Sequence, residues 1–161
     1  MGTRSGGAKD KRSGGLSLAG AKAIKDLEGE GQSVHIKEAM GELLYYTEGD
    51  GERQPVEIDV VGTYSPHYRK AQQHMRTRIM KHARRNDPDA ERALQEAITL
   101  IARCCLSWRG VVYDDQVDEP EDIPFSFDNT KMVLTEMPWI VEQLDMAMSD
   151  HEGFIKGGSP D

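Results

Sequence analysis

Apolar and polar residues alternate along three short segments of the chain, 34–36, 43–47 and 56–60. Because successive side chains of a β-strand point to opposite faces, this period of two predicts strands that bury one face. The Asp50-Gly51 pair between the second and third segments is a strong hairpin signal. A turn near Met40-Gly41 would join the first two. The pattern therefore predicts a small antiparallel β-meander of about three strands over residues 33–62.

The apolar period changes to three or four residues after this meander, and a long helix is predicted from Pro66 to Arg85. Ser65 suits the cap position of this helix, and Pro66 suits its first turn, where a missing N–H donor costs little. The apolar positions form a single stripe, and basic residues occupy the other faces. The stripe consists of Tyr64, Tyr68, Ala71, Met75, Ile79 and His82.

A second helix is predicted to start at Asp87, as its cap, with Pro88 at its first position, and to close at Trp108 and Gly110. Its apolar stripe is broad enough to be covered on two sides, which is typical of a central core helix. The stripe consists of Ala90, Leu94, Ala97, Ile98, Ile101 and Cys105, broadened by Leu100 and Cys104.

Two shorter helices are predicted in the last third of the chain. Ser126 suits the cap of the third, and Pro138 opens the fourth, over 139–151, because proline is tolerated in a first turn but not in a helix interior. Together the elements predict an α+β fold in one domain over residues 33–155. A β-meander (33–62) is followed by a four-helix α part (65–155).

The two ends of the chain are predicted to lie outside this domain. Residues 1–32 are rich in glycine, serine and charged side chains, with too little apolar surface to offset the entropy lost on ordering. We expect 1–32 to be a disordered arm, so that deletion up to Glu30 leaves the melting temperature unchanged. Residues 156–161 are expected to be a flexible tail.

The composition of the chain bears on its location in the cell. The chain has 161 residues and a formal charge of −8. It offers neither the apolar core of a signal peptide nor the roughly 20 apolar residues of a membrane span, so we expect no membrane association and a cytoplasmic location. The adjacent Cys104 and Cys105 are expected to be free and buried, which suits a reducing compartment.

The net negative charge does not favour nucleic acid as the main partner, because nucleic-acid-binding domains usually carry a basic excess. Every charged residue between Ser65 and Asn86 is nevertheless basic, whereas 114–122 is almost wholly acidic, and the two segments could face each other. The basic helix could contact DNA phosphates, but the next helix lacks the polar face of a helix-turn-helix. The alternatives are a solvated face and a docking surface for an acidic partner.

No catalytic, cofactor or metal site is predicted. His67, His74 and His82 roughly align on one helix, but seven residues make two turns, about 10 Å, which one ion does not bridge. A nucleophilic cysteine would need an electropositive, partly exposed setting. The acidic segment 114–119 lacks the glycine and glutamate of a calcium loop, and no glycine-rich phosphate loop follows a strand. We therefore expect a non-enzyme without a cofactor.

Several short motifs mark corners and core positions of the expected fold. They are Val56-Glu57-Ile58-Asp59-Val60-Val61-Gly62, Tyr64-Ser65-Pro66-His67-Tyr68-Arg69-Lys70-Ala71-Gln72, Trp108-Arg109-Gly110-Val111, Ile123-Pro124-Phe125-Ser126 with Asn129, and Pro138-Trp139-Ile140-Val141-Glu142-Gln143. In these motifs the chain, from roughly Val34 to Phe154, resembles the tail assembly chaperones of long-tailed, siphophage-type bacteriophages.

The resemblance implies a non-catalytic protein that acts in the cytoplasm of a bacterial host during virion assembly. Such a chaperone binds the long, apolar tape-measure protein and keeps it soluble until tail-tube subunits polymerise around it. The expected partners are the tape-measure protein or other tail proteins, and self-association is left open. The alternative is a structural virion protein, at the head-tail joint or in the tail, that binds neighbouring subunits.

Partner binding is expected to use exposed methionines, whose flexible side chains repack around varied partners, although methionine also fills ordinary cores. Met80, Met137 and Met146 fall off the inward stripes, and we expect them to be exposed. The other candidate partner-binding residues are Trp139, Arg76 and Arg84.

Overall fold

The computed structural model of the chain describes residues 14–83 and 90–156. Within them the helices are α1 (Leu18–Glu30), α2 (Pro66–Ala83), α3 (Ala90–Cys104), α4 (Phe127–Glu136), α5 (Pro138–Met148) and α6 (His151–Ile155). The strands are β1 (Gln32–His35), β2 (Tyr45–Thr47), β3 (Arg53–Pro55), β4 (Glu57–Val60) and β5 (Cys105–Arg109). The predicted α+β class is confirmed. The helix start predicted at Asp87-Pro88 and most of the predicted tail lie outside the described residues.

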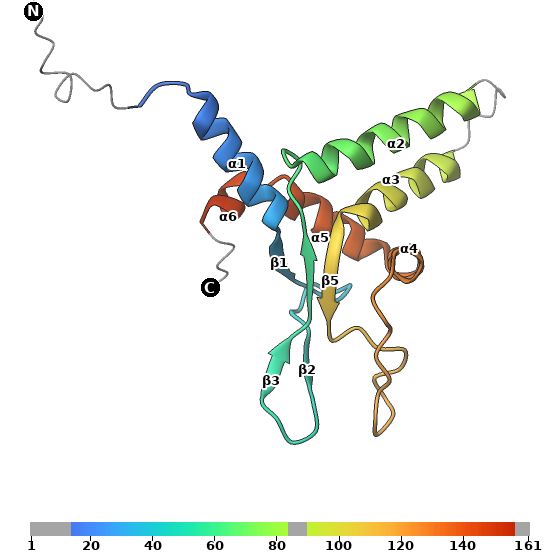
Figure 1. Ribbon diagram of the computed structural model, residues 1–161. Coiled ribbons are helices and arrows are strands. Elements are labelled where there is room, and N and C mark those ends of the chain that lie inside the picture. Colours follow the sequence, from blue (N-terminus) through green and yellow to red (C-terminus); the bar gives the residue numbers. More distant parts are fainter. Residues whose placement is uncertain (1–13, 84–89, 157–161) are drawn as a thin grey trace, which may run out of the picture.

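A three-stranded antiparallel sheet, in the order β1-β4-β5, forms the centre of the molecule (Figure 1). Its register places Val34, Ile58 and Trp108 side by side on one face. Helix α5 packs against β1 and β4, and Ile58 and Val60 are completely buried. The predicted alternation along 56–60 therefore has its expected cause, since one face of the sheet lies in the core.

The predicted hairpin is present as β2 and β3, with Tyr45 opposite Pro55 and a turn at its tip in which the Gly51 N–H donates to the Glu48 carbonyl. The order of the predicted meander is wrong, because the third predicted strand pairs with β1 and β5 instead of continuing the hairpin. Three backbone hydrogen bonds explain this arrangement: Ile36 donates to Val56, Val56 to Leu44, and Leu44 to Ile36. They close the three segments into a ring, from which the hairpin extends away from the helices (Figure 1).

Strand β5 corrects the prediction that the second helix would run to Trp108. Helix α3 ends at Cys104, and the next five residues pair with β4 across one register shift. Hydrogen bonds to β4 satisfy the backbone of this segment, and this long-range pairing outweighs the local helical period. The adjacent cysteines thus lie at a junction between a helix and a strand.

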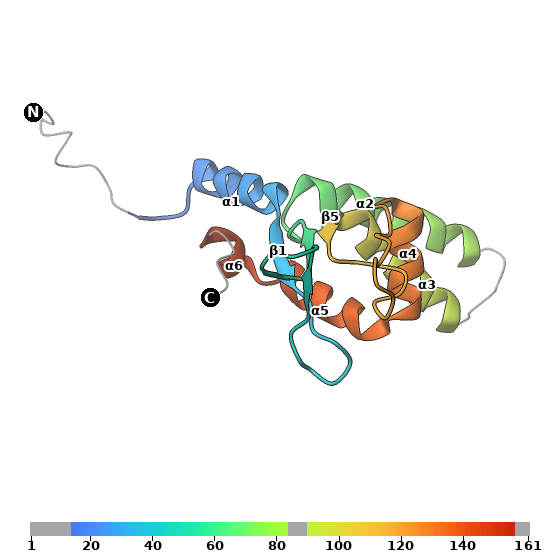
Figure 2. The same ribbon diagram turned by 90° about the horizontal axis from the view of Figure 1, so that it is seen from below.

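Helix α1 corrects the prediction that residues 1–32 are disordered, at least for the described part from Leu18 to Glu30. Most of its side chains are exposed, but Glu28 in its last turn is completely buried. The carboxylate of Glu28 accepts a hydrogen bond from the backbone N–H of Tyr64 and contacts His151. Helix α1 therefore lies beside α6, as both views show (Figures 1 and 2).

Helices α2, α4 and α5 start where the sequence predicts, whereas the short α6 was not predicted. Ser65 Oγ accepts from the N–H of Tyr68 at the start of α2, and Ser126 Oγ accepts from the N–H of Asn129 at the start of α4. Pro138 opens α5, which ends at Met148, three residues earlier than predicted. The core lies between the covered face of the sheet and helices α3, α4 and α5. Its most buried members are Ile36, Ile58, Val60, Val61, Ile98, Cys104, Leu134, Leu144 and Met148.

Candidate protein-binding surface

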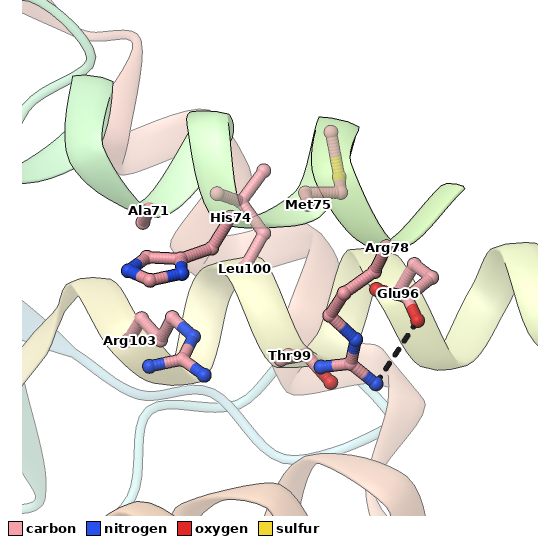
Figure 3. A pocket seen from close by; sticks show the side chains of 8 residues that line it. All are labelled: Ala71, His74, Met75, Arg78, Glu96, Thr99, Leu100 and Arg103. Carbon is pink, nitrogen blue, oxygen red and sulfur yellow. Dashed lines mark ion pairs between the residues drawn. The ribbon is translucent and has the colours of Figure 1, made fainter. Parts of the chain in front are cut away.

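Helices α2 and α3 run side by side and project from the rest of the molecule as an arm (Figure 1). At the base of the arm, Ala71 is buried, and Met75 and Leu100 are half-buried. Farther along, Arg78 of α2 pairs with Glu96 of α3, with 3.1 Å between the guanidinium and the carboxylate (Figure 3). The Glu96 side chain is only 5% exposed, whereas the Arg78 side chain is 41% exposed, so this ion pair joins the two helices at the edge of their contact.

Three large apolar side chains are exposed toward the free end of the arm: Ile79 at 46%, Met80 at 63% and Leu94 at 51%. The Arg78–Glu96 pair places them at similar heights along the two helices, but Met80 and Leu94 each lie two residues, about 200°, from that pair and so point away from the α2–α3 contact on opposite sides of the arm. We call these three residues the arm patch. Exposure of Met80 was expected, whereas the prediction that Ile79 and Leu94 point inward is wrong. Ile79 and Leu94 are exposed because this end of the arm extends beyond the rest of the described molecule, which leaves the distal part of each stripe uncovered (Figure 1).

Charged side chains are exposed on the same two helices. Arg76 and Lys81 are exposed on α2, and Glu91 is exposed on α3. Of these, Arg76 was a candidate partner-binding residue, and the structure places it on the same helix as Met80. Exposed apolar side chains with charged side chains nearby are common at protein-binding surfaces.

The other candidate residues lie elsewhere. Trp139 is 37% exposed and Met146 is 74% exposed on α5, and their seven-residue spacing places them on one face of that helix. Met137 is half-buried between α4 and α5 and packs against the core, so the prediction that it is exposed is wrong. It is buried because the two helices meet at this residue, which caps both. Arg84 lies outside the described residues.

The candidate residues therefore form two surfaces and not one. Figure 2 shows α2 and α5 on opposite sides of the molecule. The basic and acidic segments are also separated, because the acidic loop 114–122 extends toward the hairpin end, away from α2 (Figure 1). A face-to-face contact between these two segments in one chain, which the charge pattern allowed, is wrong.

The two cysteines are buried, as predicted, with Cys104 at 0% and Cys105 at 6% exposure. Burial raises the pKa of both thiols to about 12. Because the thiolate is the nucleophile, a thiol with so high a pKa is almost wholly unreactive near neutral pH. The setting of this pair favours a structural role.

A polar network crosses the open face of the sheet. Ser33, Asp59 and Ser107 lie opposite one another on three strands, and Arg109 pairs with the carboxylates of Asp59 and Glu57 at 2.8 and 3.1 Å. Burial alone would raise the pKa of Asp59, but hydrogen bonds from Arg109, Ser107 and Ser33 outweigh it and lower the pKa to about 2. A carboxylate with so low a pKa is a poor proton acceptor at neutral pH, and this network ties the three strands together.

Within residues 14–83 and 90–156, no three His, Cys, Asp or Glu side chains are grouped as metal ligands would be. His67 instead donates from Nε2 to the carbonyl oxygen of Arg103, 2.6 Å away. Among the described helices, none combines the length and the apolar character that a membrane crossing requires. Comparisons of the chain with protein-family models, with curated proteins and with solved structures give no match.

Proposed function

We propose that this chain is a tail assembly chaperone of a long-tailed bacteriophage, which binds the tape-measure protein without catalysis in the cytoplasm of the host. The observation that carries the proposal is the arm patch. Ile79, Met80 and Leu94 are exposed on a projecting helix pair that also carries exposed charged side chains. A chaperone for a long apolar protein needs accessible apolar surface together with enough charge to stay soluble itself. The formal charge of −8 meets the second requirement.

The motifs that resemble this family support the proposal, because each has a physical role in the fold. Gly62 leaves room for Glu28, since a Cβ at Gly62 would lie 2.2 Å from the carboxylate Oε1. Gly110 has a φ of +81°, which favours glycine, and a Cβ there would lie 2.5 Å from the ring of Tyr46. Trp108 donates from its indole N–H to the carbonyl of Ile123 in the next motif. Residues with such roles are those that related chains of one fold would share.

Co-expression with the tape-measure protein encoded by the same phage tests the proposal. We expect the two proteins to be recovered as a complex, and more tape-measure protein to stay soluble when this chain is present. Equal solubility with and without the chain, together with no recovered complex, would refute the proposed function.

A structural role in the virion is the second candidate, and the projecting β2–β3 hairpin favours it. Leu43 and Tyr45 at the hairpin are 45% and 39% exposed, and could pack on a neighbouring subunit. Mass spectrometry of purified particles separates the two functions. A chaperone is absent from mature particles, whereas a structural protein is present in stoichiometric copies.

A further inference from the structure

A cavity of about 620 Å³ opens between the first half of α2, the end of α3 and the segment that leads into α4. We call it the basic groove. Its side chains include His67, Lys70 and His74 from α2, Arg103 from α3, and Phe125 and Phe127 from the α4 segment. A volume of this size is typical of ligand sites, which are commonly about 300–1,000 Å³.

Cationic side chains of the basic groove lack acidic partners. Among the described residues, none that lines the groove is acidic, and neither Lys70 nor His74 forms an ion pair. The Nε of Arg103 is buried and has no hydrogen-bond partner within the described part of the chain. Figure 3 shows His74 and Arg103 next to each other at one end of the interface between α2 and α3. A carboxylate entering the groove would supply the missing acceptor.

Another part of the lining of the basic groove is aromatic. Phe125 is 37% exposed, and its ring packs edge-on against Trp108 with 5.2 Å between centroids. The Arg103 guanidinium lies over the Phe127 ring at 4.7 Å, so cationic and aromatic groups line the same space. A ligand matched to both parts of the lining carries a negative charge and an apolar group close together.

We propose that the basic groove binds a short peptide segment of a partner protein, in which a carboxylate side chain lies next to a bulky apolar one. The inference builds on the proposed protein-binding function, and the tape-measure protein would be the source of the segment. Charge complementarity selects a peptide over nucleic acid. The whole chain carries −8 and would repel a long polyanion, whereas one or two carboxylates meet only the local positive charge.

A labelled short peptide of glutamates flanking a central phenylalanine tests the proposal by fluorescence anisotropy with the full chain. Two control peptides replace the glutamates by lysines or the phenylalanine by alanine. We expect the first peptide to bind at least about tenfold more tightly than either control. Equal binding of all three peptides, or no binding of the first, would overturn the inference.

Variants of α2 locate the binding. Lys70→Glu places a negative charge in the groove and should weaken binding at least about tenfold, because the carboxylates of the peptide are then repelled. Arg69→Glu is the matched control, since Arg69 is exposed on the same helix but does not line the groove. Circular dichroism of both variants checks that they fold. Unchanged affinity in Lys70→Glu would assign the peptide to another surface.

The same measurements distinguish a peptide from two other possible ligands of the groove. Salt-dependent binding of an oligonucleotide that Lys70→Glu abolishes, without peptide binding, would assign the groove to nucleic acid. Self-association with the same dependence on Lys70, again without peptide binding, would assign it to a second copy of the chain. Either result would overturn the peptide proposal.

Failure of the groove and failure of the proposed function can be told apart. If the tape-measure complex survives Lys70→Glu and the probe peptide does not bind, the proposed chaperone function stands and the proposed peptide site in the groove is refuted. If the probe peptide binds but no tape-measure complex forms, the proposed peptide site stands and the proposed chaperone function is refuted.

Discussion

Glu28 and His151 lie 123 positions apart in the sequence, yet the Glu28 carboxylate is 2.6 Å from Nδ1 of His151. The second oxygen of the same carboxylate accepts from the backbone N–H of Tyr64 at 2.8 Å, and the Tyr64 ring stacks on His151 with 3.8 Å between centroids. One buried side chain therefore joins α1, α6 and the corner that precedes α2.

We predict that Glu28→Ala lowers the free energy of unfolding by about 1–3 kcal/mol, because it removes a completely buried side chain and leaves the part-buried Tyr64 N–H without its acceptor. Chemical denaturation measures the change. Asp26→Ala is the control on the same helix, since Asp26 forms only an exposed pair with Lys22 and should cost under about 0.5 kcal/mol. Equal effects of the two substitutions would show that the buried contact contributes nothing specific.

The same contact reverses the expectation that deletion of residues 1–30 leaves the melting temperature unchanged. Deletion up to Glu30 removes Glu28 and should lower the melting temperature. Deletion of residues 1–13 retains α1 and should leave the melting temperature unchanged, so it separates the loss of α1 from the loss of the preceding residues. An unchanged melting temperature for the longer deletion would mean that α1 does not stabilise the domain.

The Asp59 network predicts a loss of stability in acid. The pKa of Asp59 in the folded chain is about 2, below its ordinary value of 3.8, so the folded state binds the proton less readily than the unfolded state. The stabilisation is fully present above about pH 4 and is lost as the pH falls toward 2. Asp59→Asn should cost about 2 kcal/mol at pH 7 and much less at pH 2. Denaturation at both pH values tests this, and a cost that does not depend on pH would contradict it.

The two tryptophans should respond differently to truncation. Trp108 packs in register with Ile58, against Phe125, and bonds to the Ile123 carbonyl, so Trp108→Ala should cost about 3 kcal/mol. Trp139 is 37% exposed, and Trp139→Ala should cost less than about 1 kcal/mol. Thermal and chemical unfolding of both variants provide the comparison. A loss under about 0.5 kcal/mol at Trp108 would show that it is a surface residue.

Local signals were enough to predict the starts of several elements. Ser65, Ser126 and Pro138 begin helices because each satisfies or removes a backbone donor within its own turn. The predicted hairpin also forms, although its turn is centred on Gly49-Asp50 and not on Asp50-Gly51: the Gly51 N–H donates to the Glu48 carbonyl, and Gly49 has the positive φ of +55°.

Elements that depend on distant partners could not be predicted in this way. Strand β5 forms because β4 is available to pair with it, and α1 is held by the buried carboxylate of Glu28 and not by an apolar stripe. For the candidate surface, the position of Met80 off the apolar stripe predicted its exposure. The exposure of Leu94 required knowledge of which elements cover α3, and a periodic pattern does not contain that information.

The arm patch carries the proposed function, and a charge placed on it tests the central claim most directly. Met80→Asp introduces a charge into the patch, and Met40→Asp makes the same change on another exposed methionine, in the turn before Leu43. The measurement is the soluble fraction of the tape-measure protein when it is co-expressed with wild type or with each variant. We predict that Met80→Asp reduces this fraction toward the level without the chain and that Met40→Asp leaves it unchanged. Equal soluble fractions for the two variants would contradict the account.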